Sequence, residues 1–232
     1  EATMAEATTK TTKTTTRRSS PKLPPGPVGE RVAELRTQAK TDPKGARDEA
    51  WSWIEELSER SHKDRAGALE ELQELFLCGQ AAKVSGQTEG ILVTWTMHPL
   101  ADRVIGAITD SWMPWVGKKF DARKKRGINT LTDSARWPAK LLWPLYSTKD
   151  SPLGRSAFDF NTYTEAGKLD PSVNVLVIDY ESVPENPNLL IRQIRDELVQ
   201  IVPGANLGKM LVKVPRRKEL FAALYFALKS DL

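Results

Sequence analysis

The spacing of hydrophobic and polar positions changes along the chain and divides it into three stretches. Residues 1–28 are rich in Thr, Lys, Ser and Pro and contain almost no large apolar side chain, so burial cannot offset the entropy of ordering them. Residues 29–80 carry apolar side chains at helical spacing, and residues 81–232 carry short apolar segments separated by Gly, Pro, Asn and Asp. This pattern predicts a disordered basic tail, a segment of two to three helices and an antiparallel β-barrel-like domain, in that order.

Three amphipathic helices are expected in residues 29–80. The first places its apolar residues on one face, and Asp42 followed by Pro43 provides an N-cap and a first-turn proline for the second. The third ends at Gly79, because glycine is common just after helix C-termini. Short helices of this kind are stable only when their apolar faces are buried, so we expect them to pack on one another and on the domain that follows.

Eight strands are predicted in the remainder of the chain, over residues 90–96, 115–120, 128–131, 156–164, 174–180, 197–202, 207–214 and 221–228. Residues 98–114 fit a short helix between the first two strands. Residues 186–198 keep helical spacing in strand-like surroundings, so their structure stays open between helix and strand. Many short strands without regular intervening helices favour a sheet that closes on itself. The predicted fold class is α+β, a mostly antiparallel β barrel preceded by a short N-terminal helical segment.

Charge is unevenly distributed along this chain, whose formal net charge is +4. Residues 1–28 hold five basic and two acidic side chains, residues 29–80 hold eight and twelve, and the rest hold twenty-one and sixteen. An acidic helical segment and a basic barrel domain would attract each other only weakly, because solvent and salt screen surface charges.

The sequence has one cysteine, Cys78, which excludes an intrachain disulfide and fits a reducing compartment. No stretch approaches the roughly 20 consecutive apolar residues of a transmembrane helix, and the first residues lack the apolar core of a signal peptide. We therefore expect a cytoplasmic protein without a membrane span.

Familiar catalytic and cofactor motifs are absent. The sequence contains no Gly-x-Ser-x-Gly, no Gly-x-Gly-x-x-Gly and no phosphate-binding Gly-x-x-x-x-Gly-Lys-Ser/Thr. Its two histidines, His62 and His98, and its single cysteine do not give the paired ligand spacing of a zinc site. Cys78 fits a small buried apolar residue better than a nucleophile. We expect no metal, no cofactor and, on balance, no catalytic activity.

Three ionisable residues are candidates for a catalytic site: His98, Asp179 and Asp196. His98 lies between a predicted strand and a predicted helix, where it could act as a general base at a barrel mouth or simply cap the helix. Asp179 shares a strand face with Glu181, opposite Tyr180, and that face is either the barrel interior or its solvated exterior. The sequence leaves these alternatives open.

A basic run over residues 117–126 is a candidate contact loop, formed by Lys118, Lys119, Arg123, Lys124, Lys125 and Arg126. It could meet an anionic surface or an acidic protein partner, or it is a solvated hairpin tip. Phe120 is the only aromatic residue among these charges, which argues against stacking on nucleic-acid bases.

Aromatic residues concentrate near the first two predicted strands and in residues 136–153. Prolines at 138, 144 and 152 exclude one regular element over 136–153, although the segment is too apolar to lie free in water. We expect it to cover a cavity at the barrel mouth, with ordinary core packing as the alternative. The candidate ligand-binding residues are Trp95, His98, Trp112, Trp115, Trp137, Trp143 and Tyr146.

Short motifs are spread between Leu75 and Leu228. They are Gly86-x-Thr88-x-Gly90 before Trp95, His98-Pro99-Leu100, Trp115-x-Gly117-Lys118-x-Phe120-Asp121, Ile178-Asp179-Tyr180, Asp196-Glu197-Leu198-Val199, Leu207-Gly208-Lys209 and Tyr225-Phe226-Ala227-Leu228. Together they resemble a poorly characterised family of actinobacterial proteins that is itself similar to the GXWXG-type, lipocalin-like group. The resemblance implies a calycin-like barrel that holds an apolar ligand.

Three functions remain for the structure to address. The leading hypothesis is a non-catalytic binding protein that holds a small apolar ligand, such as a lipid, terpenoid or polyketide-like molecule, in the barrel. The first alternative is an enzyme on the same barrel that uses His98 with a carboxylate. The second is an interaction protein that uses the basic residues 118–126 or the acidic helices.

Overall fold

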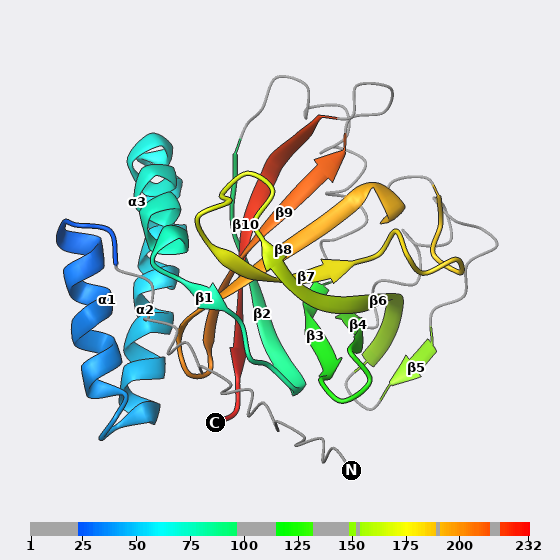
Figure 1. Ribbon diagram of the computed structural model, residues 1–232, viewed down its shortest axis with the longest axis horizontal. Coiled ribbons are helices and arrows are strands. Elements are labelled where there is room, and N and C mark those ends of the chain that lie inside the picture. The colour runs from blue at the N-terminus through cyan, green and yellow to red at the C-terminus, as the bar shows by residue number, and fades with distance from the viewer. Residues whose placement is uncertain (1–22, 97–114, 132–148, 152–153, 189–190, 214–218) are drawn as a thin grey trace, which may run out of the picture.

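The computed structural model describes residues 23–96, 115–131, 149–151, 154–188, 191–213 and 219–232 (Figure 1). Three helices come first, α1 (Pro27–Gln38), α2 (Pro43–Ser61) and α3 (Arg65–Leu77), as the sequence predicts. The strands follow: β1 (Gln80–Ala81), β2 (Gly86–Trp95), β3 (Trp115–Asp121), β4 (Arg126–Leu131), β5 (Lys149–Ser151), β6 (Gly154–Ala166), β7 (Asn174–Asp179), β8 (Ile194–Val202), β9 (Ala205–Lys213) and β10 (Leu220–Ser230).

Eight of these strands close into an antiparallel barrel. Their order around the ring is β2, β3, β4, β6, β7, β8, β9 and β10, so each strand pairs with its neighbours along the chain. Strand β10 closes the ring by pairing with β2 over seven residue pairs, whereas β2 and β3 share two pairs. Short β1 adds to β8, and short β5 adds to β6. The predicted α+β class with an antiparallel barrel is confirmed.

All eight predicted strands are present in the barrel. The ambiguous residues 186–198 contain a short 3₁₀ helix (Ile191–Gln193) followed directly by β8. The predicted helix over 98–114 lies outside the described residues. Within the part of the chain that the structure describes, none of the helices combines the length and apolar character that a membrane span needs.

Helix ends follow local sequence signals. The Asp42 carboxylate accepts a hydrogen bond from the Gly45 N–H at 2.8 Å, and Pro43 occupies the first turn of α2, which confirms the predicted cap. Asp64 caps α3 in the same way, by accepting from the Gly67 N–H at 3.0 Å. These short side chains therefore satisfy backbone donors that a helix leaves free at its start.

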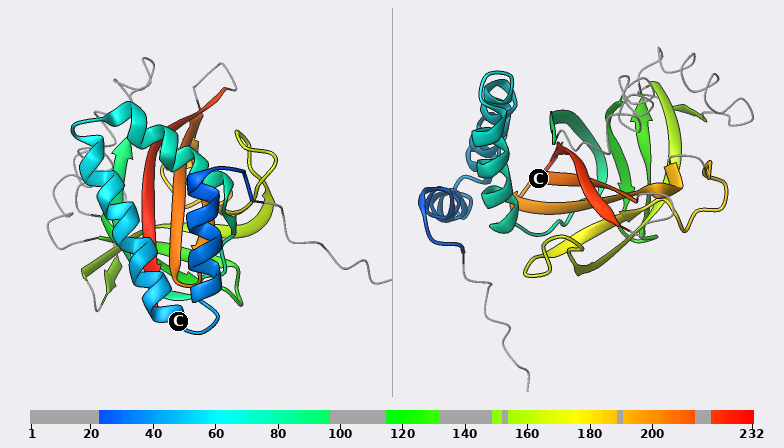
Figure 2. Two further views of the ribbon diagram at one scale, coloured as in Figure 1. Left: turned by 90° about the vertical axis from the view of Figure 1, so that its left-hand side faces the viewer. Right: turned by 90° about the horizontal axis from the view of Figure 1, so that it is seen from above.

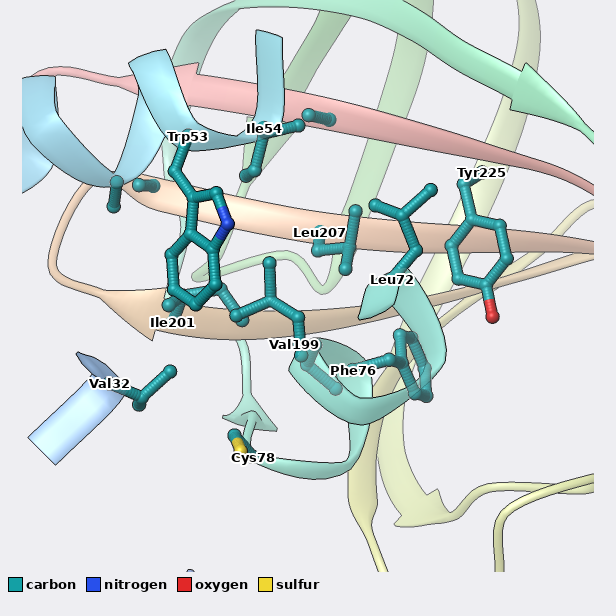
Figure 3. Packing of buried hydrophobic residues seen from close by; sticks show 14 of the residues in the cluster. Val32, Trp53, Ile54, Leu72, Phe76, Cys78, Val199, Ile201, Leu207 and Tyr225 are labelled. Carbon is teal, nitrogen blue, oxygen red and sulfur yellow. The ribbon is translucent and has the colours of Figure 1, made fainter. Parts of the chain in front are cut away.

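The helices form one layer on the outer wall of the barrel, over β8, β9, β10 and β2 (Figure 2). Apolar side chains from the helices, such as Ile54 and Leu72, meet outward-facing Val199, Ile201 and Leu207 in one buried cluster (Figure 3). Apolar burial therefore dominates this contact between an acidic layer and a basic barrel.

A second apolar cluster fills the barrel interior. Side chains of β7, β8 and β10 alternate between the two clusters, because successive residues of a strand point to opposite faces. In β8, for example, Ile194 and Leu198 point into the barrel, whereas Val199 and Ile201 point toward the helices. The helices thus cover part of the outside of the sheet, and its inside packs against itself.

Candidate ligand-binding site

A cavity of about 710 Å³ opens at one end of the barrel. It lies between the segment that leads into β2, the β3–β4 hairpin, and strands β6 and β7. Ala82, Val84, Phe120 and Leu176 form its apolar floor. Because these residues belong to the interior apolar cluster or pack against it, the floor of the cavity is the end of the barrel core.

The rim of this cavity is positively charged. Lys83, Lys125 and Arg126 line it and are exposed, and none of them has an ion-pair partner among the described residues. Asp121 also lines it, but its carboxylate accepts a hydrogen bond from the Lys124 N–H at 3.1 Å and lies 3.5 Å from Lys124 Nζ. The bond from the Lys124 N–H lowers the pKa of Asp121. Three uncompensated cations therefore surround an apolar floor.

The predicted contact loop is a hairpin whose tip spans residues 122–125. Arg123, Lys124, Lys125 and Arg126 are exposed there, and Lys119 is exposed on β3. Lys125 adopts a φ of 52°, which places the tip in a tight left-handed turn. Only Lys125 and Arg126 of these basic residues line the cavity.

Lys118 does not belong to this loop, and its assignment to a surface contact is wrong. It lies in β3 two residues before Phe120, so both side chains point into the barrel while Lys119 points outward. The Lys118 side chain is 0% exposed. The Lys118 ammonium group therefore faces the barrel interior and cannot contact an external surface.

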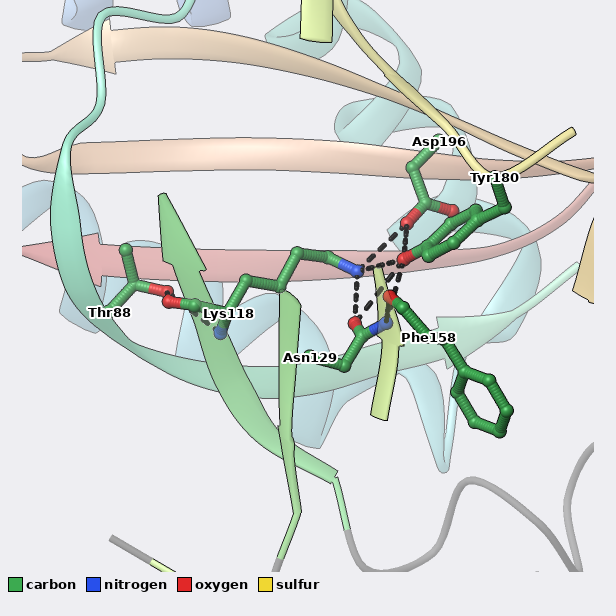
Figure 4. A network of polar contacts seen from close by, with 6 residues as sticks. All are labelled: Thr88, Lys118, Asn129, Phe158, Tyr180 and Asp196. Atoms are coloured by element: carbon green, nitrogen blue, oxygen red, sulfur yellow. Dashed lines mark hydrogen bonds and ion pairs between the residues drawn. The ribbon is translucent and has the colours of Figure 1, made fainter. Parts of the chain in front are cut away.

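Lys118 anchors a buried polar network inside the barrel (Figure 4). Its Nζ lies 3.0 Å from Asp196 Oδ2 and donates to Asn129 Oδ1 at 2.7 Å and to the Tyr180 hydroxyl at 2.6 Å. The Tyr180 hydroxyl donates to Asp196 Oδ2 at 3.1 Å. Asn129 donates to the Phe158 carbonyl at 3.3 Å. Strands β3, β4, β6 and β8, with the residue that follows β7, thus converge on one polar centre.

Burial sets the electrostatics of this centre. Loss of solvent lowers the pKa of Lys118 and raises the pKa of Asp196, and the attraction between the two charges opposes both shifts. Loss of solvent, followed by the nearby Asp196 charge, also raises the pKa of Tyr180 well above its usual value. Tyr180 therefore stays a neutral hydroxyl that can donate to the carboxylate.

The two candidate carboxylates do not share a site. Asp196 points into the barrel, whereas Asp179 occupies an outward-facing position at the end of β7, beside inward-facing Ile178 and Tyr180. The Asp179 carboxylate accepts from the N–H groups of the next turn, at 2.9 Å from Glu181 and 3.2 Å from Ser182. It therefore caps a turn on the solvated side.

The candidate aromatic residues divide in two groups. Trp95 and Trp115 are partly buried and pack against the interior cluster, and the Trp115 ring meets Phe226 edge-on at 5.8 Å. The other candidate residues lie outside the described residues: His98, Trp112, Trp137, Trp143 and Tyr146. The proposed covering segment, residues 136–153, lies largely outside them as well.

Asp196 and Lys118 were both named from the sequence, but not as partners, and Asn129 and Tyr180 were not predicted as site residues. Asp196 alternates with Ile194 and Leu198, but it lay in the segment whose structure stayed open between helix and strand, and Lys118 as its partner was not predicted. Asn129 gave no signal, because amides are common on both faces of a strand. Among the described residues, no three His, Cys, Asp or Glu side chains lie together as a metal site requires.

The fold and the site define a closed antiparallel barrel that carries a buried ion pair inside and an amphipathic cavity at one end. No family model and no curated protein matches the chain. Among solved structures, the chain is similar to one described as "Crystal structure of protein from Thermomonospora curvata". The two sequences are 16% identical, the match covers 76% of this chain and 99% of that chain, and the TM-score is 0.37.

Proposed function

We propose that this protein binds a small amphipathic anion in the cavity at the end of the barrel. The observation that carries the proposal is an apolar floor, continuous with the barrel core, inside a rim of three cations without ion-pair partners in the described structure. The apolar body of the ligand would lie on Phe120, Val84 and Leu176. Its anionic group, such as the carboxylate of a lipid, would meet Lys125 and Arg126.

Two features of the sequence that suggested separate functions come together in this proposal. One is an apolar ligand held by a barrel, and the other is a basic hairpin that meets an anion. The volume of about 710 Å³ falls within the range of about 300–1,000 Å³ that is usual for small-molecule sites. The cavity opens to solvent beside the hairpin, so a charged group can stay hydrated while the rest of the ligand is buried.

Apolar burial and charge make different contributions to binding. Each buried methylene contributes about 0.8 kcal/mol, so affinity should rise with tail length until the cavity is full. The cationic rim lies in water, where salt screens it, so it selects the sign of the charge and adds less affinity than the tail.

Isothermal titration calorimetry with ligands that share one tail tests the charge preference. Decanoate is expected to bind more tightly than decanol, and decyltrimethylammonium is expected to bind least, with the preference for decanoate shrinking as salt rises. Equal binding of all three, or no binding of decanoate, would contradict the proposal.

A pair of matched variants tests the position of the anion. Replacing Lys125 and Arg126 together by Gln removes two charges from the rim, and we expect decanoate affinity to fall about tenfold, as about 1.4 kcal/mol of lost interaction implies. The control replaces Lys119 and Arg123 by Gln, which removes the same charge from the same hairpin outside the cavity. Equal losses in the two variants would indicate general attraction to a basic surface.

A further inference from the structure

The β3–β4 hairpin carries more positive charge than the cavity uses. Residues 123–126 are Arg, Lys, Lys and Arg, and all four are exposed. Only Lys125 and Arg126 of these four line the cavity. Arg123 lies outside it and has no ion-pair partner among the described residues. Positive charge therefore extends from the mouth of the cavity onto the outside of the hairpin.

Lys83 adds to this charge from a different part of the chain. It is exposed in the segment that leads into β2, and it lines the cavity together with Lys125 and Arg126. Asp121 is the one acidic residue among the described residues that line the cavity, and its carboxylate lies 3.5 Å from Lys124 Nζ. This end of the barrel is thus electropositive, and its long basic side chains reach into water, where they can meet a charged surface.

An exposed aromatic ring lies at the same mouth. Tyr163 of β6 lines the cavity and is 41% exposed. Its hydroxyl accepts a hydrogen bond from Arg195 Nη1 at 3.3 Å, which ties the polar end of the side chain to the barrel wall. Tyrosine is enriched at the boundary between water and lipid, because its ring is apolar and its hydroxyl stays hydrated. Basic side chains beside an exposed tyrosine are therefore a combination that suits a membrane surface.

An acidic protein and an anionic lipid bilayer are the two candidates for the partner of this surface. A stable protein contact buries about 800 Å² on each partner with close shape complementarity, and a single hairpin tip offers little area. Adsorption to a bilayer needs no shape fit, because the surface potential of anionic lipids attracts each Lys or Arg separately. A bilayer also contains amphipathic anions, the class of ligand proposed for the cavity. The bilayer is therefore the partner that fits both the hairpin and the cavity.

We propose that the β3–β4 hairpin docks the protein on an anionic lipid bilayer, with the mouth of the cavity facing the lipid. Arg123 and Lys124 meet the anionic head groups together with the cations of the cavity rim, and Tyr163 lies at the level of the head groups. The choice of a bilayer rests on the proposed function, whereas the charge that docks belongs to the hairpin and its surroundings. Because the contact is mainly electrostatic, it is reversible and weakens as salt rises.

Co-sedimentation of the unaltered protein with lipid vesicles tests the docking. Vesicles of phosphatidylcholine that contain about one third phosphatidylglycerol are expected to bind the protein, and rising salt should release it. Vesicles of phosphatidylcholine alone are expected to leave the protein in solution. Equal binding to the two kinds of vesicle, or binding to neither, would overturn the proposal. Tighter binding to soluble polyglutamate than to the anionic vesicles would also overturn it, in favour of an acidic protein partner.

A charge reversal outside the cavity assigns the docking to the hairpin. Arg123→Glu alters no residue that lines the cavity, and we expect affinity for the anionic vesicles to fall about tenfold, since one attraction becomes a repulsion. Arg65→Glu is the matched control, because Arg65 is exposed at the start of α3, in the helical layer that lies away from the hairpin (Figure 1). This variant should keep its affinity for the vesicles. Equal losses in the two variants, both checked for folding by circular dichroism, would show that net charge controls adsorption and would overturn the proposal.

Decanoate separates the docking from the ligand site. At physiological salt, Arg123→Glu is expected to keep decanoate affinity within about twofold, because its charge lies outside the cavity and is screened by solvent. Loss of decanoate affinity together with vesicle affinity would overturn the assignment of Arg123 to docking alone. An unaltered protein that binds decanoate but no anionic vesicles would overturn the docking and leave the ligand proposal standing. Binding of anionic vesicles without binding of decanoate would overturn the ligand proposal and leave the docking standing.

Discussion

Burial of the Lys118–Asp196 pair inside the barrel carries a large free-energy cost of desolvation. Each charge loses its hydration on burial. Mutual attraction, the bond that Lys118 donates to Asn129 and the bond that Tyr180 donates to Asp196 replace that hydration only in part. Buried pairs of this kind are poor sources of stability, but removing one member is severe, because the other charge is then left alone in a medium of low polarity.

Substitution of the two charges separately and together should show this asymmetry. Lys118→Met is expected to lower the free energy of unfolding by about 3–5 kcal/mol, because Asp196 loses its counter-ion. The double variant Lys118→Met with Asp196→Leu should lie within about 2 kcal/mol of the original protein, because both charges are gone and Tyr180 can still bond Asn129. Urea unfolding followed by circular dichroism gives these values. A double variant as unstable as the sum of the single ones would contradict the argument.

Cys78 should react slowly in the folded protein. Its side chain is 2% exposed at the end of α3, and burial raises the pKa of the thiol, so little reactive thiolate is present at neutral pH. We expect a colorimetric disulfide reagent to label it at least a hundredfold more slowly in buffer than in guanidinium chloride. Fast labelling in buffer would show that α3 separates readily from the barrel.

At the residue scale, the sequence marked Asp196 as a candidate without showing which way it points, and it placed Lys118 in a surface loop. Asp196 stands at alternate positions with Ile194 and Leu198, but these residues also keep helical spacing, so its direction stayed open. Lys118 stands in a run of basic residues, where a charge is ordinarily solvated, and only its spacing of two from Phe120 separates it from its neighbours. Pairing between β3 and β8 is not local, so no short-range pattern could match the two charges.

At the scale of elements, one arginine joins three segments. Arg36 of α1 donates from Nη2 to the Cys78 carbonyl at 2.7 Å, beside the C-terminus of α3, and from Nε to the Ile201 carbonyl of β8 at 3.0 Å. Both acceptors are backbone groups, so the geometry depends on the path of the chain and not on side-chain rotamers. Arg36 therefore fixes where the helical layer meets the barrel.

Arg36→Met keeps an unbranched apolar stem and removes the donors of the guanidinium group. We expect the free energy of unfolding to fall by about 2 kcal/mol, because hydrogen bonds from a charged group are lost and buried carbonyls are left without them. Arg65→Met is the control, since Arg65 lies exposed at the start of α3. Thermal unfolding by calorimetry should separate the two variants, and equal midpoints would contradict the role of Arg36.

The elements were predicted more fully than their ends. All eight barrel strands and all three helices follow from periodicity, because most of them bury a continuous face and so carry a strong pattern. Strand β2 begins at Gly86, four residues before its predicted start, since residues 86–89 are mainly polar. The two-residue β1 and three-residue β5 were not predicted, because strands so short have no periodicity.

At the scale of the whole molecule, the sheet serves two apolar cores at once. Outward residues of β8 and β9, such as Val199 and Leu207, pack under the helices, while inward residues, such as Leu198 and Met210, fill the barrel. The sequence predicts a barrel with helices packed on it, but the wall that the helices cover and the end that opens to solvent depend on contacts between distant segments. The periodicity of the sequence could predict neither the covered wall nor the open end of the barrel.

A shared sheet should make the helices and the barrel unfold as one unit. Neither core can be lost without exposing one face of β8 and β9, so we expect backbone amides of α2 and β9 to exchange by the same global opening. Hydrogen exchange followed by mass spectrometry should show similar protection for peptides from both elements, and Ile54→Ala should lower both together. Early exchange of α2 while β9 stays protected would show that the helices form a separable unit.

The way the ring closes also bears on biosynthesis. Strand β2 is held by β10 over seven residue pairs and by β3 over only two. During translation, β2 emerges from the ribosome more than a hundred residues before β10. Strand β2 therefore lacks its principal pairing strand, β10, until synthesis is nearly complete. A nascent or truncated chain that stops before Leu220 would present two open strand edges, on β2 and β9, to other copies of itself. Chaperone capture of the nascent chain, and aggregation of prematurely terminated products, are the expected cellular consequences of joining the first and last strands of the ring.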